Sequence, residues 1–578
     1  MTLILRSFYK IRRIPPIYAV GLAPVLAAQM KVQRFGTSAE PPATTPRISR
    51  EFRLPLKLCR FSHQRHMCWM LLAASFVLAR VALLPVLPVP DPEIHDEFSY
   101  LLAADTFAHG RLANPAITQP EFFEAPHVLL SPSYASKYPP GQGLALAFGQ
   151  KYLGDPYWGV VLSGALMIFL FCWAADAWLP PQWTLIAGGL SWILFFIGHY
   201  WLTSYWGGNV AACGGALMVG GLGRVSRSCS TFGRFSLAAG AIILYLTRPY
   251  EGGALCLLIL GILAVYVCLL SGPRKQTLLR VVILPNAFLM AAAVPLAAYY
   301  NWAVTGHATK LPDVVHMQQY DSVPAFWFLP PYPEKQYHTE SNRYVWARAR
   351  EAYDRLHEAS PLRLLMLQSR SIVLGGIVRQ FLGFGLLLFG LPWARIHGKT
   401  WLMVLFAGWA ATLFPEVWAA GHYSAPFTAV HLILIVGTGR TLWYRVAAVR
   451  WRAIVLPIAF LLAFAPLGVL YAGALQDHST DRGRLIRNLK SMGGNHLAFV
   501  EYSKGWNFER EWVYNGADLA TSRVLFVHSR SDRENRELME RYSGRTAWRV
   551  HLGPQQSDVR VERYDALQSG LSSAQLSP

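Results

Sequence analysis

The residues best suited to chemistry gather near the start of the segment DPEIHDEFSYLLAADTFAHGRL, residues 91–112. Asp96 and Glu97 form an acidic step, and Tyr100 follows four residues after Asp96, on the same face of a helix. A carboxylate placed in this way can accept a proton from an attacking hydroxyl or amine, or orient that group. It can also hold a divalent metal together with Glu97. The competing interpretation is structural, because acids at a helix start stabilise the helix dipole.

Charged and aromatic groups near two predicted membrane spans are suited to binding a phosphate or a sugar. Arg248 and Glu251 stand in TRPYEG, where Pro249 breaks regular helix and can turn both side chains toward a cavity. A guanidinium binds phosphate oxygens bidentately, so we expect Arg248 to bind phosphate and Glu251 to orient it. The alternative is a structural ion pair. His422 and Tyr423 precede another span and are predicted to bind phosphate or sugar, although an interfacial histidine is more often structural.

Tyr205, Trp206 and Asn209 lie at the outer mouth of span 208–223 and could stack on, or hydrogen-bond to, a sugar. An aromatic belt at the membrane interface is the competing explanation. The span itself is rich in glycine and alanine, which close helix packing explains without any site.

The acidic segment that carries Asp96 is predicted to form an amphipathic helix at the outer membrane interface. Asp91 is expected near its N-cap, Pro92 in its first turn and Gly110 at its end. An apolar stripe supports this helix, formed by Phe98, Leu101, Leu102 and Phe107.

Composition identifies the elements that position these residues as membrane spans. Of the 578 residues, 53% are hydrophobic and only 15% are charged, against about 25% in soluble domains. Apolar runs of about 20 residues recur, which excludes a soluble multidomain chain and a disordered one. We predict about eleven transmembrane helices, at 67–88, 158–179, 184–204, 208–223, 235–250, 252–270, 281–304, 371–393, 400–418, 424–439 and 453–473.

The positive charge of the chain orients these spans. The formal net charge is +20, and alternate segments (1–66, 224–234, 271–280, 394–399 and 440–452) are strongly basic. Such segments are typical of the cytoplasmic side. The charge is therefore an orientation signal that attracts anionic lipid, and it gives no indication of nucleic acid.

Three parts follow from this topology. Residues 1–66 are predicted to be a cytoplasmic basic N-terminal extension, and 67–473 a transmembrane domain with outer loops 89–157 and 305–370. Residues 474–578 are predicted to form a small outer α/β domain, with strands at 496–502, 523–529 and 547–552 and a helix at 533–544. The seven cysteines show no zinc-site spacing, and we expect no disulfides in the outer loops.

The Asp96-Glu97 step, directly after the first span and at the start of an outer helix, resembles the signature of the GT-C glycosyltransferases. The nearest likeness is to the protein O-mannosyltransferases and the bacterial aminoarabinose–lipid A transferases. SKYPPGQGL (136–144) is similar to their Lys-Pro-Pro-Leu element, with Lys137 in place, Tyr138 inserted and Gly141 where leucine is usual. Further segments, SYWGGNVAACGGAL, TRPYEG, YYNWAVTG and GHYSAP, resemble bacterial family 39-like membrane proteins over roughly residues 67–560.

This resemblance implies a GT-C-like fold and a sugar transferred from a polyprenyl-phosphate donor to a lipid, glycan or protein acceptor. Transfer would occur at the outer face of the bacterial cytoplasmic membrane and would invert the anomeric centre. It implies that Asp96 is the base or a metal-associated carboxylate and that Lys137 faces the phosphate. Arg248 is our first candidate for binding the phosphate, and Lys137 and His422 are the next candidates. Two other classes stay open: a transporter or flippase of lipid-linked sugars, and a non-catalytic envelope assembly protein. The sequence shows no internal repeat of the kind common in transporters.

Overall fold

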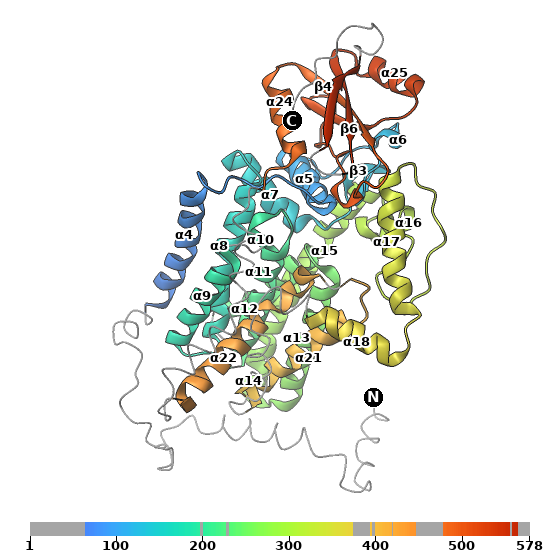
Figure 1. Ribbon diagram of the computed structural model, residues 1–578. Coiled ribbons are helices and arrows are strands. Elements are labelled where there is room, and N and C mark those ends of the chain that lie inside the picture. The colour runs from blue at the N-terminus through green and yellow to red at the C-terminus, as the bar shows by residue number, and fades with distance from the viewer. Residues whose placement is uncertain are drawn as a thin grey trace.

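The computed structural model describes residues 64–196, 200–226, 231–373, 393–395, 399–418, 420–446, 478–554 and 558–564. A long helical bundle fills the lower part of Figure 1, and a smaller domain with a β-sheet caps its upper end. The predicted extension at 1–66 lies almost entirely outside the described residues. Three helices of the second outer loop flank the bundle: α16 (Pro312–Gln319), α17 (Glu340–His357) and α18 (Pro361–Ser371).

The bundle is built from the predicted spans. It comprises α4 (Arg65–Leu83), α8 (Tyr157–Asp176), α9 (Pro181–Phe196), α10 (Tyr200–Thr203), α11 (Gly208–Val225), α12 (Thr231–Tyr245), α13 (Pro249–Leu269), α14 (Gly272–Thr277), η2 (Leu278–Ile283), α15 (Leu284–Thr305), α21 (Thr400–Leu413), η4 (Gly421–Phe427) and α22 (Thr428–Val446). Each predicted span within the described residues coincides with a helix, whereas 371–393 and 453–473 lie largely outside them.

The bundle has the surface of a membrane protein. Among the described residues, 5 helices are long and apolar enough to cross a membrane. Leu257, Phe288 and Leu296 are 71%, 74% and 73% exposed. Apolar side chains so far exposed on several helices form a surface suited to lipid rather than to water.

Helix α11 packs closely in the centre of the bundle. A Cβ added to Gly215 would lie 2.0 Å from the Pro426 carbonyl oxygen of η4, and one added to Gly220 would lie 2.3 Å from the Trp173 ring. The small residues therefore allow neighbouring backbone and aromatic rings to approach. Close packing explains this stretch, as the sequence predicted.

The first outer loop carries α5 (His95–Ala108), β1 (Asn114–Pro115), α6 (Pro120–Phe123), β2 (Val128–Leu129), β3 (Ser133–Ser136) and α7 (Pro140–Leu153). The prediction that Asp91 and Pro92 begin the helix was wrong, because α5 begins at His95 and Ile94 is its N-cap. Asp91 instead accepts a hydrogen bond from the Thr480 N–H at 2.9 Å. Gly110, with φ of 73°, follows the helix as predicted.

The outer domain has a four-stranded sheet in the order β5-β4-β6-β7, formed by β5 (Val524–His528), β4 (Asn495–Tyr502), β6 (Arg545–Leu552) and β7 (Val559–Arg563). β4 is parallel to β5 and β6, and β7 is antiparallel to β6. The predicted strands are confirmed, as is the helix, α25 (Asp532–Arg541), which a capping box of Ser531 and Glu534 begins. Strand β7 and helix α24 (Asp481–Ser491) were not predicted.

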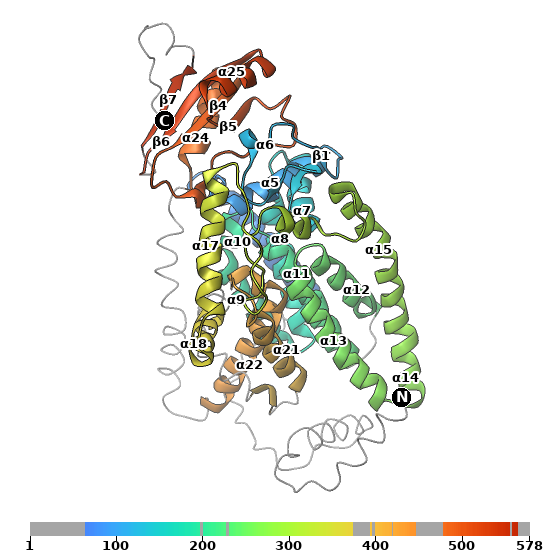
Figure 2. The same ribbon diagram turned by 90° about the vertical axis from the view of Figure 1, so that its right-hand side faces the viewer.

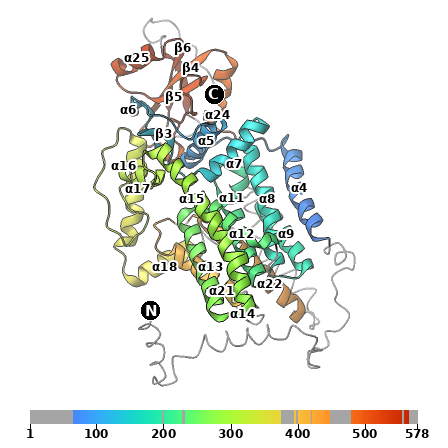
Figure 3. The ribbon, with the colours of Figure 1, turned by 180° about the vertical axis from the view of Figure 1, so that it is seen from behind.

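The outer domain and the first outer loop share one hydrophobic core. Phe98 of α5 stacks on Tyr514 with ring centroids 4.5 Å apart, and Phe122 packs in the same cluster as Leu525. The Ala517 N–H donates to Asp105 at 2.7 Å. Helix α5 is therefore held between the bundle and the sheet domain, as Figures 2 and 3 show from two further sides.

Candidate active site

The Asp96 carboxylate stands at the centre of a polar cluster on the bundle side of the outer loop. Helix α5 places it in the first turn, where its Oδ2 lies 3.0 Å from His95 Nδ1. The Tyr138 hydroxyl donates a hydrogen bond to Oδ1, and His127 Nε2 lies 3.9 Å from the same oxygen. Segments far apart in the first outer loop thus converge on one carboxylate.

The surroundings keep Asp96 ionised. Burial raises its pKa, but the charges of His95 and His127 and the hydrogen bonds from His95 and Tyr138 more than offset this, so the pKa is held well below its usual range. Burial, reinforced by Lys137, holds the pKa of His127 well below that of an ordinary histidine. With His127 uncharged at neutral pH, the hydrogen bonds from His95 and Tyr138 remain to stabilise the carboxylate.

An aromatic pair lies between Asp96 and Arg248, the residue predicted to bind phosphate. Tyr100 and Tyr138 stack with centroids 4.4 Å apart and rings inclined by 16°. Burial raises the pKa of Tyr100 to about 12, while Arg248 lowers it and Asp96 and Glu251 raise it. The charges of Arg248, Asp96 and Glu251 therefore all act on Tyr100. The prediction that Asp96 and Tyr100 share one face of a helix is confirmed by their place in α5.

Arg248 lies at the N-cap of α13 and is largely buried. Its Nη1 is 3.7 Å from Glu251 Oε1, and its guanidinium lies 4.7 Å from the centroid of the Tyr423 ring. The Tyr200 hydroxyl is 3.3 Å from His422 Nδ1. Arg248 and Glu251 of one predicted segment and His422 and Tyr423 of another thus form one contiguous group.

Lys137 belongs to the same cluster from the opposite side. Its Nζ is 3.7 Å from Asp313 Oδ1 and lies 5.3 Å from the centroid of the Tyr138 ring. His316 of α16 completes this side: its Nδ1 is 3.1 Å from Asp321 Oδ1, and its ring centroid is 6.0 Å from that of His127. The second outer loop therefore closes the cluster that the first loop begins.

Glu97 has a structural environment. Its Oε2 accepts the N–H groups of Glu93 at 2.9 Å and Ile94 at 3.0 Å, and its Oε1 accepts the Tyr205 N–H at 3.0 Å. Burial raises its pKa to about 7 although these three bonds lower it. The Glu97 carboxylate therefore connects the start of α5 to the segment before α11. The catalytic role that the sequence predicted for Glu97 stays a prediction.

Tyr205 and Asn209 use their polar groups within the protein. The Tyr205 hydroxyl donates to the Pro90 carbonyl at 3.0 Å, and Asn209 Nδ2 donates to the Trp201 carbonyl at 3.0 Å. Both residues are buried. The Tyr205 hydroxyl and the Asn209 amide N–H are thus already used within the protein. The contacts with a sugar that the sequence predicted for these two residues stay a prediction.

Sequence reasoning missed His95, His127, Tyr138 and His316. His95 adjoins the acidic step, which was a usable signal, whereas His127 and His316 are isolated histidines in long loops. Tyr138 was visible only as an insertion in the lysine-proline element, yet its hydroxyl contacts Asp96. The inserted residue that distinguishes this segment from the Lys-Pro-Pro-Leu element is therefore a member of the cluster.

The cluster fits a divalent metal better than the predicted Asp96–Glu97 pair does. His95, Asp96 and His127 each offer a ligand atom, and these atoms lie within 4.8 Å of one another. His127 Nδ1 is buried with no hydrogen-bond partner among the described residues, and His127 has a φ of 64°, which non-glycine residues rarely adopt. A two-histidine, one-carboxylate set suits Zn²⁺ or another transition metal.

An apolar groove runs along α13 and α21 from the neighbourhood of Arg248. It has a volume of about 680 Å³, and its walls include Leu257, Leu258, Val265 and Val404. Tyr250, two residues after Arg248, lies at one end, where its hydroxyl donates to the Thr412 carbonyl at 2.9 Å. The groove offers an apolar chain a path along the bundle to the buried cation.

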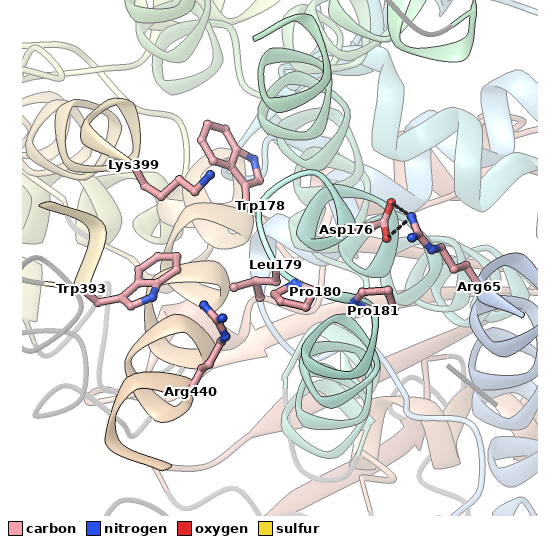
Figure 4. Close-up of a pocket in the computed structure, with 9 residues that line it drawn as sticks. All are labelled: Arg65, Asp176, Trp178, Leu179, Pro180, Pro181, Trp393, Lys399 and Arg440. Atoms are coloured by element: carbon pink, nitrogen blue, oxygen red, sulfur yellow. Dashed lines mark hydrogen bonds and ion pairs between the residues drawn. The ribbon is translucent and has the colours of Figure 1, made fainter. Parts of the chain in front are cut away.

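Two further cavities lie at opposite ends of the molecule. The outer one, about 570 Å³, lies between the start of α5, the segment after α10 and the outer domain. The other, about 430 Å³, is lined on one side by Asp176 and Arg65, which lie 3.1 Å apart, and on the other side by Lys399 and Arg440 (Figure 4). Cations thus gather at the end of the bundle farthest from Asp96.

No protein-family model and no curated protein sequence matches the chain. Similar solved structures include the Archaeoglobus fulgidus oligosaccharyltransferase tethered with an acceptor peptide, at 9% identity and TM-score 0.44, covering 84% of this chain and 68% of that one. The same organism's AglB, in complex with an inhibitory peptide and a dolichol-phosphate, gives 10% and 0.44, covering 84% and 69%. ArnT from Cupriavidus metallidurans in the apo state gives 13% and 0.31, covering 84% and 92%.

Proposed function

We propose that this chain is a membrane glycosyltransferase that moves a sugar from a polyprenyl-phosphate donor to an acceptor at the outer face of the membrane. The observation that carries the proposal is the placement of an ionised carboxylate, Asp96, and a buried cation, Arg248, around the stacked rings of Tyr100 and Tyr138. One group suits an acceptor that loses a proton, and the other suits a leaving phosphate. The resemblance of the Asp96-Glu97 step to the GT-C signature supports the same reading.

The donor would bind with its phosphate at Arg248 and its polyprenyl chain along the α13–α21 groove. Lys137 and His422 add a cation and a hydrogen-bonding imidazole on either side of the cluster. Buried positive charge stabilises the departing phosphate more strongly than it would in water. Glu251 lies 3.7 Å from Arg248 and would hold the guanidinium in place.

In the proposed reaction, the acceptor oxygen or nitrogen attacks the anomeric carbon and a new glycosidic bond forms. The bond from that carbon to the phosphate oxygen breaks, and polyprenyl phosphate departs with the electron pair. The acceptor proton passes to the Asp96 carboxylate and then to water. A carboxylate of low pKa is a weak base, so Asp96 acts chiefly by orienting the acceptor, and in-line attack inverts the anomeric centre.

His95, Asp96 and His127 would hold a divalent metal if the enzyme uses one. When bound there, such an ion supplies positive charge that polarises an acceptor or phosphate oxygen. Tyr138 then fixes the orientation of Asp96 through its hydroxyl. Glu97 contributes by holding the start of α5 in register through its three backbone bonds.

We place the protein as a multi-pass protein of a bacterial cytoplasmic membrane, with the cluster and the outer domain outside. The cation-lined cavity at the far end of the bundle supports this orientation, because basic residues favour the cytoplasmic side. The proposed partners are the lipid-linked sugar, a lipid, glycan or protein acceptor and the bilayer. Nucleic acid is not a proposed partner.

The test uses the full chain in nanodiscs with undecaprenyl phosphate carrying radiolabelled glucose, mannose or 4-amino-arabinose, and with membrane extract as acceptor. We expect label to move to an acceptor, and Asp96→Asn to reduce the rate about 10²-fold or more, because the acceptor loses the carboxylate that orients it. Asp354→Asn is the matched control, since Asp354 is an exposed residue of α17 paired with Arg350.

The alternatives give different results when the same chain is reconstituted in sealed vesicles. Movement of the labelled lipid across the bilayer without transfer would identify a transporter or flippase. Neither movement nor transfer would identify an assembly protein. Full transfer by Asp96→Asn would contradict the site assignment.

A further inference from the structure

Four residues that line the outer cavity each carry a buried polar side-chain atom that the described residues leave unbonded. Trp206 Nε1, Trp506 Nε1, His478 Nε2 and Glu511 Oε2 are buried and have no hydrogen-bond partner among the described residues. Trp506 is 5% exposed and Glu511 1%. Leaving one such group unpaired costs about 1–3 kcal/mol, so several around one cavity point to a ligand that bonds them.

The unbonded atoms define what that ligand must offer. Two indole N–H groups can only donate, and the free oxygen of Glu511 accepts when ionised. The other oxygen of Glu511 is already used, because it accepts from the Tyr502 hydroxyl and from the Val513 N–H at 2.7 Å. A ligand with hydroxyl groups satisfies both needs, since each hydroxyl donates and accepts.

The lining of the cavity holds five acids and three arginines, an excess of negative charge that disfavours a phosphate. Asp91 pairs with Arg487 at 3.0 Å and Glu93 with Arg510 at 2.6 Å. Asp481 pairs with Arg484, and Arg482 donates to the carbonyls of Trp512 and Tyr514 at 3.0 and 2.7 Å. Most charged side chains of the lining thus already have partners within the protein. The described residues of the lining therefore offer no group of unpaired cations that would bind an anion.

Aromatic walls complete the site. Tyr200, Trp206, Trp506 and Trp512 line a cavity of about 570 Å³, within the roughly 300–1,000 Å³ of small-molecule sites. Aromatic rings offer apolar faces to the carbon-bound hydrogens of a sugar, while the indole N–H groups reach its hydroxyls. The combination suits a neutral saccharide.

The cavity adjoins the Asp96–Arg248 cluster. Tyr200 and Trp206 both contact His422, the first at 3.3 Å and the second with ring centroids 4.8 Å apart. The neighbouring Tyr423 packs on Arg248 at 4.7 Å. Glu97, next to Asp96 in the chain, also lines the cavity. A ligand held here would therefore lie on the side of His422 away from Arg248.

We infer that this cavity between α5 and the outer domain binds a neutral saccharide, as the sugar portion of the acceptor. The acceptor part of the inference rests on the proposed function, whereas saccharide binding does not. The outer domain supplies Trp506, Glu511 and Trp512, so its part in the reaction would be to hold this acceptor.

The test is saturation-transfer NMR on the full chain in nanodiscs with maltose, cellobiose, α-1,2-mannobiose and N,N′-diacetylchitobiose, and with glucose 6-phosphate as a charged probe. We expect a signal from at least one neutral disaccharide. Glu511→Gln and Trp506→Phe should weaken its binding about tenfold, because each removes a bonding group.

Two matched variants act as controls. Glu501→Gln changes a carboxylate that binds Arg549 and His551 outside the cavity, and Trp548→Phe changes an indole already bonded to His496 at 3.0 Å. Both should bind as the wild type does. No signal from any neutral disaccharide, a signal from glucose 6-phosphate alone, or equal losses in cavity and control variants would overturn the inference.

Failure of the proposed function gives a different pattern. Asp96→Asn should keep disaccharide binding while losing transfer, and the bound disaccharide should compete with acceptor in the wild type. Binding without transfer in the wild type would overturn the proposed function and leave the saccharide cavity standing. Transfer without saccharide binding would overturn the saccharide cavity and leave the proposed function standing.

Discussion

Burial raises the pKa of the Asp96 carboxyl, but the charges of His95 and His127 and the hydrogen bonds from His95 and Tyr138 hold it well below its usual range. Asp96 should therefore stay ionised down to a pH below about 3.9, the ordinary value for aspartate. As a group with a depressed pKa, it adds stability above that pH and loses it as the pH falls through its folded pKa. An activity that needs the carboxylate should keep its acid limb in the same low range.

Tyr138→Phe should move that acid limb upward and reduce kcat about tenfold. The phenylalanine ring can still stack on Tyr100, but the hydrogen bond that lowers the Asp96 pKa is lost. The measurement is the pH profile of kcat/KM. Tyr337→Phe is the control, because its hydroxyl donates to the Tyr320 carbonyl at 2.8 Å and not to Asp96. An unmoved acid limb in Tyr138→Phe would show that the tyrosine does not act through Asp96.

Sequence predicted the charged members of the site better than their polar neighbours. Asp96, Arg248 and Lys137 stand out because ionisable residues beside apolar spans need a reason. His127 and Tyr138 carry no such signal, since their importance depends on a loop path that returns them to α5. The surroundings of Glu97 were equally hidden, because its bonds involve backbone groups as far away as Tyr205.

At the scale of elements, Glu97 fixes where α5 begins. Glu97→Ala should lower the stability in detergent by about 1–3 kcal/mol, because the N–H groups of Glu93, Ile94 and Tyr205 lose their acceptor. Glu97→Gln keeps an acceptor oxygen and should lose less. The readout is the thermal unfolding midpoint alongside transfer activity. A Glu97→Gln protein that unfolds like the wild type but transfers no sugar would restore the chemical part first predicted for Glu97.

Helix α11 should tolerate no side chain where it meets η4. Gly215→Ala would bring a Cβ to 2.0 Å from the Pro426 carbonyl, so α11 and η4 must separate and carry His422 with them. We expect a lower unfolding midpoint and a lower transfer rate. Gly189→Ala of α9 is the control, because nothing lies within 4 Å of its added Cβ, and helix propensity should make it neutral or stabilising.

The spans and strands were predictable because their patterns are local: long apolar runs for helices, and short apolar and aromatic runs for β4, β5 and β6. The true start of α5 was not, because the partner that occupies Asp91 is Thr480, from the outer domain. Helix α24 is short and polar, and it is stabilised by packing Leu485 and Leu489 against the sheet. Such tertiary partners override what a local cap predicts.

At the scale of the whole molecule, the proposed orientation has a direct test. In a variant without native cysteines, Lys504→Cys in the outer domain should react with a membrane-impermeant maleimide added to intact cells. Lys275→Cys in α14, at the other end of the bundle, should react only after the cells are opened. Lys504 is exposed and Lys275 is partly exposed in the structure. Labelling of Lys275→Cys in intact cells would reverse the orientation.

The shared core of α5, α6 and the outer sheet has a consequence for biosynthesis. Phe98 and Phe122 are made early, but Leu525 and Val527, which bury them, are made some 400 residues later. Until these last strands are made, the aromatic side chains stand uncovered and the loop that carries Asp96 packs on the bundle alone. A ribosome that stalls before β5 thus leaves a chain with an exposed apolar patch. The residues of the Asp96–Arg248 cluster all precede β5, so the last step of synthesis covers the other side of α5 and adds nothing to the cluster itself.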